Sequence, residues 1–480
     1  MDPLLTLSGT ALARLIRQRG TQSVDVVEAH ARRVREVNPR VNAMVADRFD
    51  LARAEARAAD LRVAREDPAT LPPFLGVPCT VKECFALTGM PNTGGLPSRV
   101  GHPATKDATA VARYRAAGAI PLGVTNVSEL CLWMEASNPN YGRTNCAYDP
   151  GRTSGGSSGG EGALIGSAAS PFGVGSDIGG SIRMPAFFNG VFGHKPSGGL
   201  VPNTGQFPCA EHGLVRVLTT GPICRRAEDL YPLLRLLAGP DGVDTGCTVL
   251  PLGDPATVSL EGLDVVSVED DGLLSVSDDL RDAQRRAASC LAARGARVRV
   301  ERVPALARAI LMWTATVATG GESTYLSLLG NGKPFHLGLE FLLWAAGRGR
   351  HTLPALGLGL IEAVSARFPP RFGPLLEETA ALGADLARRL GPGGVLLYPS
   401  YPEPAPRHNK PLLRPINWIY TGIFNVLEMP VTQVPLGLND RGLPLGCQVA
   451  SIHGNDHRTI AVAMALEQAM GGWVPPDPRG

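Results

Sequence analysis

Residues 151–185 read GRTSGGSSGGEGALIGSAASPFGVGSDIGGSIRMP, and no other stretch of the chain constrains its fold as strongly. A flexible Gly/Ser linker would lack apolar residues such as Ile178 and Ile182. A phosphate-binding loop would need G-x-x-x-x-G-K-[ST] or a dinucleotide fingerprint, and neither occurs here. Gly155–Gly159 matches the G-x-S-x-G nucleophile elbow around Ser157, but the HGGG-type oxyanion loop that accompanies such an elbow does not occur. A structured loop with a reactive serine fits better.

The second part of this stretch, SDIGGS at 176–181, suits attack on an amide. Such attack requires an exposed nucleophile and N–H donors aimed at the developing oxyanion. Small residues allow successive backbone N–H groups to point at one spot. A serine hydroxyl also needs a base, and a lysine can serve when burial favours its neutral form. The following backbone positions are predicted to form the anion-binding nest: Ile178, Gly179, Gly180 and Ser181.

The flanking sequence predicts an α/β fold. Hydrophobic periodicity and turn residues predict a strand–helix–strand rhythm, which is typical of a single large domain with a mixed, mainly parallel, twisted sheet covered by helices on both faces. The segments are helices at 23–37, 51–66, 107–117, 280–296 and 374–390, strands at 75–81, 119–124 and 395–398, and a hairpin formed by 431–438 and 443–450. Asp107 is expected to cap its helix, and Lys82 follows the first strand directly.

Four motifs resemble those of the amidase signature family. They are GVPCTVKE at 76–83, GVTN at 123–126, GGSSGG at 155–160 and DIGGS at 177–181. The resemblance covers residues 5–475 and implies one amidase domain of that fold. Within the family the chain is similar to the fatty-acid amide hydrolase 2 branch, chiefly through residues 175–208. The resemblance therefore implies a serine amidase acting on amides with fatty-acyl or aryl groups.

The resemblance also assigns roles to individual residues. Ser181 would be the acyl-forming nucleophile, Ser157 a bridging serine after a cis Gly156–Ser157 bond, and Lys82 the base. The nest at 178–181 would be the oxyanion hole. The remaining assignments are Ser158 as a hydrogen-bond support for Lys82, Asp177 and Arg183 as loop supports, and Cys131, Leu132, Trp133 and Met134 as part of a substrate channel.

Residues 304–365 form an apolar segment with aromatic side chains such as Trp313 and Trp344. Two interpretations stay open. The segment could consist of ordinary core helices, or it could be a helical insertion that covers a lipophilic substrate or contacts a bilayer surface. The expected partner is a small-molecule amide, and the family allows a homodimer.

Composition excludes several classes. The net charge of +2, without a long basic run, gives no case for nucleic acid. Nine scattered cysteines without a C-x-x-C pair argue against a disulfide framework or a zinc site, and no metal or cofactor is expected. The N-terminus lacks signal-peptide features and no apolar run could span a bilayer, which predicts a cytoplasmic protein. Three alternatives remain: an amidotransferase A-type subunit in a complex, an esterase or urethanase, and an inactive scaffold.

Overall fold

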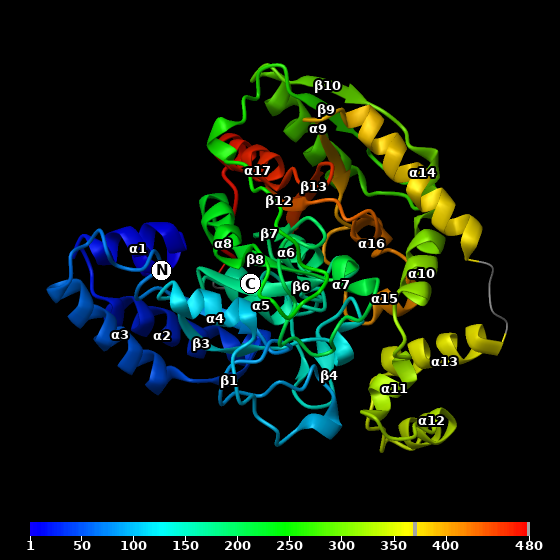
Figure 1. Cartoon of the computed structure of the whole chain (residues 1–480), viewed down its shortest axis with the longest axis horizontal. Helices are drawn as coiled ribbons and strands as arrows, with labels where there is room; N and C mark the ends of the chain where they lie inside the picture. The colour runs from blue at the N-terminus through cyan, green and yellow to red at the C-terminus, as the bar shows by residue number, and fades with distance from the viewer. Residues whose placement is uncertain (368–371, 478–480) are drawn as a thin grey trace.

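The computed structural model describes residues 1–367 and 372–477, so residues 368–371 of the expected amidase domain lie outside the described part. Its centre is an eleven-stranded sheet in the order β1-β3-β2-β6-β8-β7-β12-β13-β11-β9-β10 (Figure 1). A two-stranded ribbon, β4-β5, stands apart. The strands are β1 Met44–Asp47, β2 Pro78–Lys82, β3 Ile120–Thr125, β4 Ser137–Asn138, β5 Gly142–Arg143, β6 Phe172–Asp177, β7 Phe192–Lys195, β8 Thr219–Cys224, β9 Asp264–Ser267, β10 Arg297–Val300, β11 Val395–Pro399, β12 Val431–Leu438 and β13 Pro444–Ala450.

The sheet is mixed, as predicted. Its four parallel pairings lie in two blocks, β3-β2-β6 and β11-β9-β10, and the other six pairings are antiparallel. The expected predominance of parallel pairs therefore holds only within these blocks. The physical reason is the connections: β2 and β3 are joined by a crossover that contains a helix, whereas β12 and β13 are joined by a short turn, which imposes antiparallel pairing.

Helices cover both faces of the sheet. In β6 the ring of Phe172 packs edge-on against Tyr114 of α4 at 5.6 Å, while the next residue, Gly173, lies beneath Glu161 of α5. Successive strand residues point to opposite faces, so α4 and α5 lie on opposite sides. The helices are α1 Gly9–Arg17, α2 Ser23–Val41, α3 Phe49–Arg65, α4 Thr109–Ala116, α5 Gly159–Gly166, α6 Arg183–Phe188, α7 Leu214–Val217, α8 Leu230–Leu237, α9 Asp278–Ala292, α10 Ala309–Gly320, α11 Tyr325–Gly330, α12 Leu337–Ala345, α13 Leu353–Arg367, α14 Gly373–Leu390, α15 Lys410–Leu413, α16 Ile419–Val426 and α17 Asp456–Met470.

The predicted elements are confirmed with small shifts of their ends, but one predicted cap is wrong. Asp107 does not cap α4, whose N-cap residue is Ala108. The Asp107 carboxylate instead accepts hydrogen bonds from Thr88 and pairs with Arg115 at 2.6 Å. Asp107 thus bonds to a loop residue and to Arg115 instead of capping the helix, as local sequence had predicted.

One part of the apolar 304–365 segment packs into the body of the protein, and another part exposes apolar side chains. Its first long helix, α10, packs against α16 in the body of the protein. Helices α11, α12 and α13 lie together at one edge of the molecule (Figure 1). Among the described residues, none of the helices is both long and apolar enough to cross a bilayer. The exposed apolar side chains of α12 and α13 are Leu339, Leu342, Trp344, Leu360, Ile361 and Val364.

The Gly/Ser stretch is tightly packed, which excludes a flexible linker. A Cβ atom on Gly156 would lie 2.4 Å from the Trp133 carbonyl oxygen. A Cβ atom on Gly160 would lie 2.4 Å from the Asn126 nitrogen, and one on Gly162 would lie 2.7 Å from the Pro185 carbonyl oxygen. The stretch therefore passes through the protein where only hydrogen fits.

Candidate active site

Lys82 ends β2 and its side chain is fully buried. Its Nζ lies 2.7 Å from Ser157 Oγ and 2.9 Å from Ser176 Oγ, with the Ser176 carbonyl oxygen at 3.4 Å. All three partner groups are uncharged. Lysine and the first predicted serine, 75 residues apart in sequence, are therefore in direct contact.

Ser157 and Ser158 occupy the turn before α5, and the Gly156–Ser157 peptide bond is cis, as predicted. The hydroxyl of Ser158 donates to the Ser176 carbonyl at 3.4 Å rather than to Lys82. The hydroxyl that contacts Lys82 is that of Ser176, which sequence reasoning missed. The only sequence feature that pointed to Ser176 was its position immediately before the DIGGS motif.

Ser181 lies in the turn just before α6, next to the loop that carries Ser157. The backbone N–H of Ser158 donates to the Ser181 carbonyl at 3.2 Å. The Ser181 side chain makes no hydrogen bond among the described residues and the residue is 7% exposed, against 1% for Ser157. Of the two serines, Ser181 is therefore the more accessible to a substrate.

Four N–H groups of the loop 178–181 were expected to face an oxyanion, and one of them has a partner within the protein. The N–H of Gly180 donates to Asp177 Oδ1 at 2.7 Å. Within the described part of the chain, no acceptor faces the N–H groups of Ile178, Gly179 and Ser181. Gly180 has φ +120°, and a Cβ there would lie 2.0 Å from Thr421 Oγ1, so glycine is required.

Asp177 and Arg183 form a fully buried ion pair that braces this loop. Arg183 Nη2 lies 2.8 Å from Asp177 Oδ1, and the same carboxylate accepts from Ile182 N–H and Asn425 Nδ2. Burial alone would raise the pKa of Asp177, but the adjacent guanidinium and the N–H donors hold it well below its usual range. The carboxylate is thus charged, and it fixes the bend between Asp177 and Arg183.

Glu161 of α5 is a second buried carboxyl near the site that sequence reasoning missed. Its oxygens accept hydrogen bonds from Thr80 at 2.6 Å and Thr125 at 2.8 Å. Burial raises its pKa to about 8, although the hydrogen bonds from both hydroxyls oppose the change. At neutral pH Glu161 is therefore mostly protonated and adds little negative charge near Lys82.

The predicted channel residues Cys131, Leu132, Trp133 and Met134 lie beside the cis peptide bond. Cys131 is buried, and the Trp133 backbone packs on Gly156. Leu132 instead faces an apolar cluster shared with Tyr325 and Leu329 of α11. Met134 Sδ accepts from Tyr401 at 3.6 Å. The stretch therefore joins the candidate site to the apolar segment.

Glu129, just before this stretch, makes a second connection to the apolar segment. Its carboxylate is buried and lies 2.6 Å from His351 Nδ1, and it accepts from both Thr352 N–H and Thr352 Oγ1 at 2.8 Å. Thr352 immediately precedes α13. The N-terminus of α13 is therefore fastened to the loop that borders Ser157.

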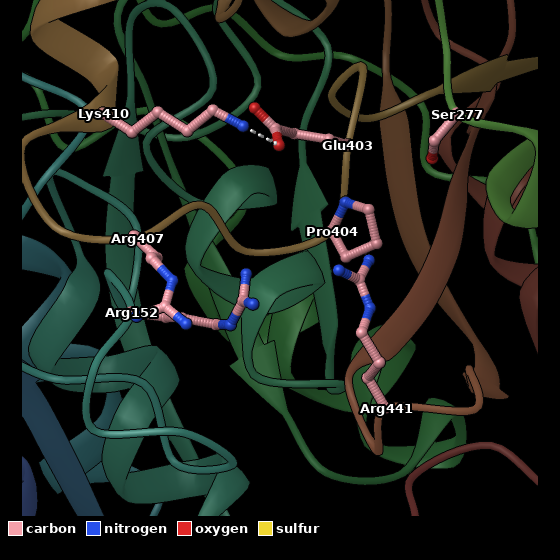
Figure 2. Close-up of a pocket in the computed structure, with 7 residues that line it drawn as sticks. All are labelled: Arg152, Ser277, Glu403, Pro404, Arg407, Lys410 and Arg441. Carbon is pink, nitrogen blue, oxygen red and sulfur yellow. Dashed lines mark hydrogen bonds and ion pairs between the residues drawn. The ribbon is translucent and has the colours of Figure 1, made fainter.

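A separate hollow of about 410 Å³ is lined by basic side chains from several segments (Figure 2). Two of its cations already have partners: Arg152 pairs with Asp149 at 2.8 Å and Lys410 with Glu403 at 2.5 Å. The lining includes none of the predicted site residues. It consists of Arg152, Ser277, Glu403, Pro404, Arg407, Lys410 and Arg441.

Comparison with known proteins places the chain in one family. The family described as Amidase matches residues 25–460. Human fatty-acid amide hydrolase 2 is 47% identical over 99% of this chain and 91% of its own length. A glutamyl-tRNA(Gln) amidotransferase subunit of Acidothermus cellulolyticus is 29% identical over 98% of this chain and 95% of its own length. The solved structure of a 6-aminohexanoate cyclic dimer hydrolase complexed with substrate superposes with a TM-score of 0.80 at 25% identity, covering 98% of each chain.

Proposed function

Because the chain belongs to the amidase signature family, we propose that it is a serine amidase that hydrolyses amides with hydrophobic groups through an acyl-enzyme on Ser181. One observation carries the proposal. The buried Lys82 Nζ lies 2.7 Å from Ser157 Oγ, next to Ser181, which is more exposed than Ser157, and to three N–H groups that have no acceptor among the described residues. These are the base, relay, nucleophile and oxyanion donors that amide hydrolysis requires.

The proposed reaction moves one proton along the three side chains. Neutral Lys82 takes the proton of Ser157, which takes that of Ser181 once the Ser181 hydroxyl turns toward it. Ser181 Oγ attacks the amide carbonyl, and the oxyanion accepts hydrogen bonds from the free N–H groups of Ile178, Gly179 and Ser181. The proton returns through Ser157 to the leaving nitrogen, since an amine anion leaves poorly. Water then hydrolyses the ester of Ser181, which releases the acid.

The hydrophobic substrate class is supported by the apolar surroundings and by the likeness to fatty-acid amide hydrolase 2. We further propose that the exposed apolar side chains of α12 and α13, such as Leu342 and Ile361, contact a lipid surface from which such substrates enter.

All nine cysteines are unpaired, which suits a reducing compartment and supports a cytoplasmic location. We also propose that the protein forms a homodimer, which a molar mass measured by light scattering would test.

The test compares serine variants of the purified chain. Ser181→Ala should abolish hydrolysis of oleamide and labelling by a fluorophosphonate probe. Ser167→Ala is the matched control, because this buried hydroxyl lies in the same Gly/Ser stretch and has no hydrogen-bond partner among the residues that the structure describes. Labelling of Ser181→Ala at another serine would contradict the nucleophile assignment. A wild-type chain that hydrolyses amides only with added partner proteins would favour the amidotransferase alternative, and a panel of acyl chain lengths with matching esters would define the substrate.

A further inference from the structure

The carbonyl groups of the 177–180 backbone are each held by a hydrogen bond from outside the loop. The Asp177 carbonyl accepts from Asn425 Nδ2 at 2.8 Å, the Gly179 carbonyl from Thr421 Oγ1 at 2.7 Å, and the Gly180 carbonyl from Met184 N–H at 2.7 Å. The Ile178 carbonyl accepts from the indole Nε1–H of Trp313 at 2.9 Å. Each bond fixes one peptide plane.

These planes decide where the candidate oxyanion donors point. In a trans peptide unit the C=O and the following N–H point in opposite directions. The Ile178–Gly179 bond is trans, since the cis bonds of the described chain are Gly156–Ser157 and Phe207–Pro208. Holding the Ile178 carbonyl toward Trp313 therefore directs the Gly179 N–H away from the indole, and this N–H has no acceptor among the described residues.

Trp313 differs from the other three partners in where it comes from. Asn425 and Thr421 belong to α16 and Met184 to α6, which are parts of the buried body. Trp313 is half-buried and lies in α10, the helix by which the apolar 304–365 segment packs against α16. Its ring meets that of Trp418 edge-on at 4.5 Å, and a Cβ on Gly179 would lie 3.0 Å from the Trp418 ring.

We propose that Trp313 is a positioning residue for the oxyanion site: its indole N–H sets the Ile178–Gly179 peptide plane and so aims the Gly179 N–H at the substrate oxyanion. This inference rests on the proposed amidase function. It also couples two parts of the chain. Displacement of α10, and of the apolar segment that continues from it, would turn the Gly179 donor away from the substrate.

The test uses two variants of the same aromatic pair. Trp313→Phe keeps an aromatic ring but removes the N–H, so kcat should fall about tenfold, less than the hundredfold or more that follows complete loss of an oxyanion donor. KM should change little, and affinity for a trifluoromethyl ketone, which forms a tetrahedral adduct, should fall by the same factor as kcat/KM. Trp418→Phe is the control, because the indole N–H of Trp418 bonds none of the four loop carbonyls. It should lower kcat less than Trp313→Phe does, and its effect measures how much of the loss in Trp313→Phe comes from altered packing alone.

An independent readout shows whether the hydrogen bond is the cause. The chain has five tryptophans, and with ¹⁵N-labelled tryptophan one slowly exchanging indole N–H signal should disappear in Trp313→Phe and remain in Trp418→Phe. A Trp313→Phe variant that raises KM at unchanged kcat would make Trp313 a pocket wall and overturn the proposal. An equal loss of kcat in both variants would also overturn it. If instead the wild-type chain neither hydrolyses amides nor reacts with a fluorophosphonate, the proposed function itself fails.

Discussion

Glu161→Gln should stabilise the protein increasingly as pH rises, because it removes a carboxyl that folding buries. The pKa of Glu161 is raised from 4.5 to about 8 by burial, against the opposing effect of the hydrogen bonds from Thr80 and Thr125. Between these two pH values the folded protein holds a proton that the unfolded chain has lost, so stability falls as pH rises. The slope is about 1.4 kcal/mol per pH unit, and the full shift corresponds to about 5 kcal/mol.

Glutamine has the same shape and does not titrate. Its amide can still accept from Thr80, while the Thr125 hydroxyl can turn to the Val81 carbonyl at 3.4 Å and accept from the amide nitrogen. The unfolding free energy of the variant minus that of wild type should therefore grow by about 3 to 4 kcal/mol from pH 5.5 to 8.5 and then level off. Any constant cost of the substitution cancels from this difference.

The assay is equilibrium urea unfolding of both proteins across that pH range. Glu377→Gln, which replaces an exposed carboxyl, supplies the baseline. A free-energy difference between Glu161→Gln and wild type that stays flat across the range would refute the reasoning, since it would mean that Glu161 is already ionised in the folded protein at the lower pH.

Three other substitutions have expected outcomes. Lys82→Ala should lose most hydrolysis at neutral pH, and a rate near wild type in the same assay would contradict its role as base. Gly180→Ala should lower kcat about 100-fold or more, measured by steady-state kinetics, because its Cβ would lie 2.0 Å from Thr421 Oγ1 and force the donor loop to move. Asp177→Asn should cost about 3 to 5 kcal/mol at pH 7, seen as a lower melting temperature, because it leaves the Arg183 charge buried without its partner. Since the pKa of Asp177 is depressed, wild type should lose that stabilisation only as pH falls below about 4, and a variant as stable as wild type at neutral pH would argue against the pair.

Local sequence predicted most elements and the short-range part of the site. Lys82, Ser157 and Ser181 stand in contiguous motifs, so a family resemblance was enough to bring them together. The bond from Gly180 N–H to Asp177 was also predictable in principle, because aspartate side chains often bond to a backbone N–H a few residues on. The prediction of four oxyanion donors did not consider this bond.

The partners that hold the site loop could not be predicted in this way. Trp313 is 135 residues from the carbonyl that it holds, and Thr421 and Asn425 are 242 and 248 residues from theirs. Nothing in the local pattern around a tryptophan or threonine indicates which distant carbonyl it will meet. Tertiary packing also determined the contacts of Asp107, which bonds Thr88 and Arg115 instead of capping its own helix.

The glycines that fill the stretch before Ser181 have a consequence for how mutational surveys of this protein should be interpreted. Gly156, Gly160 and Gly162 meet neighbouring backbone atoms where a Cβ would be, so each should reject every replacement. A saturation scan would score them as harshly as Ser157, although they take no part in proton transfer. Loss of function on substitution in this stretch therefore reports the lack of space for a side chain. A catalytic residue is identified only where the substituted protein still folds but is inactive.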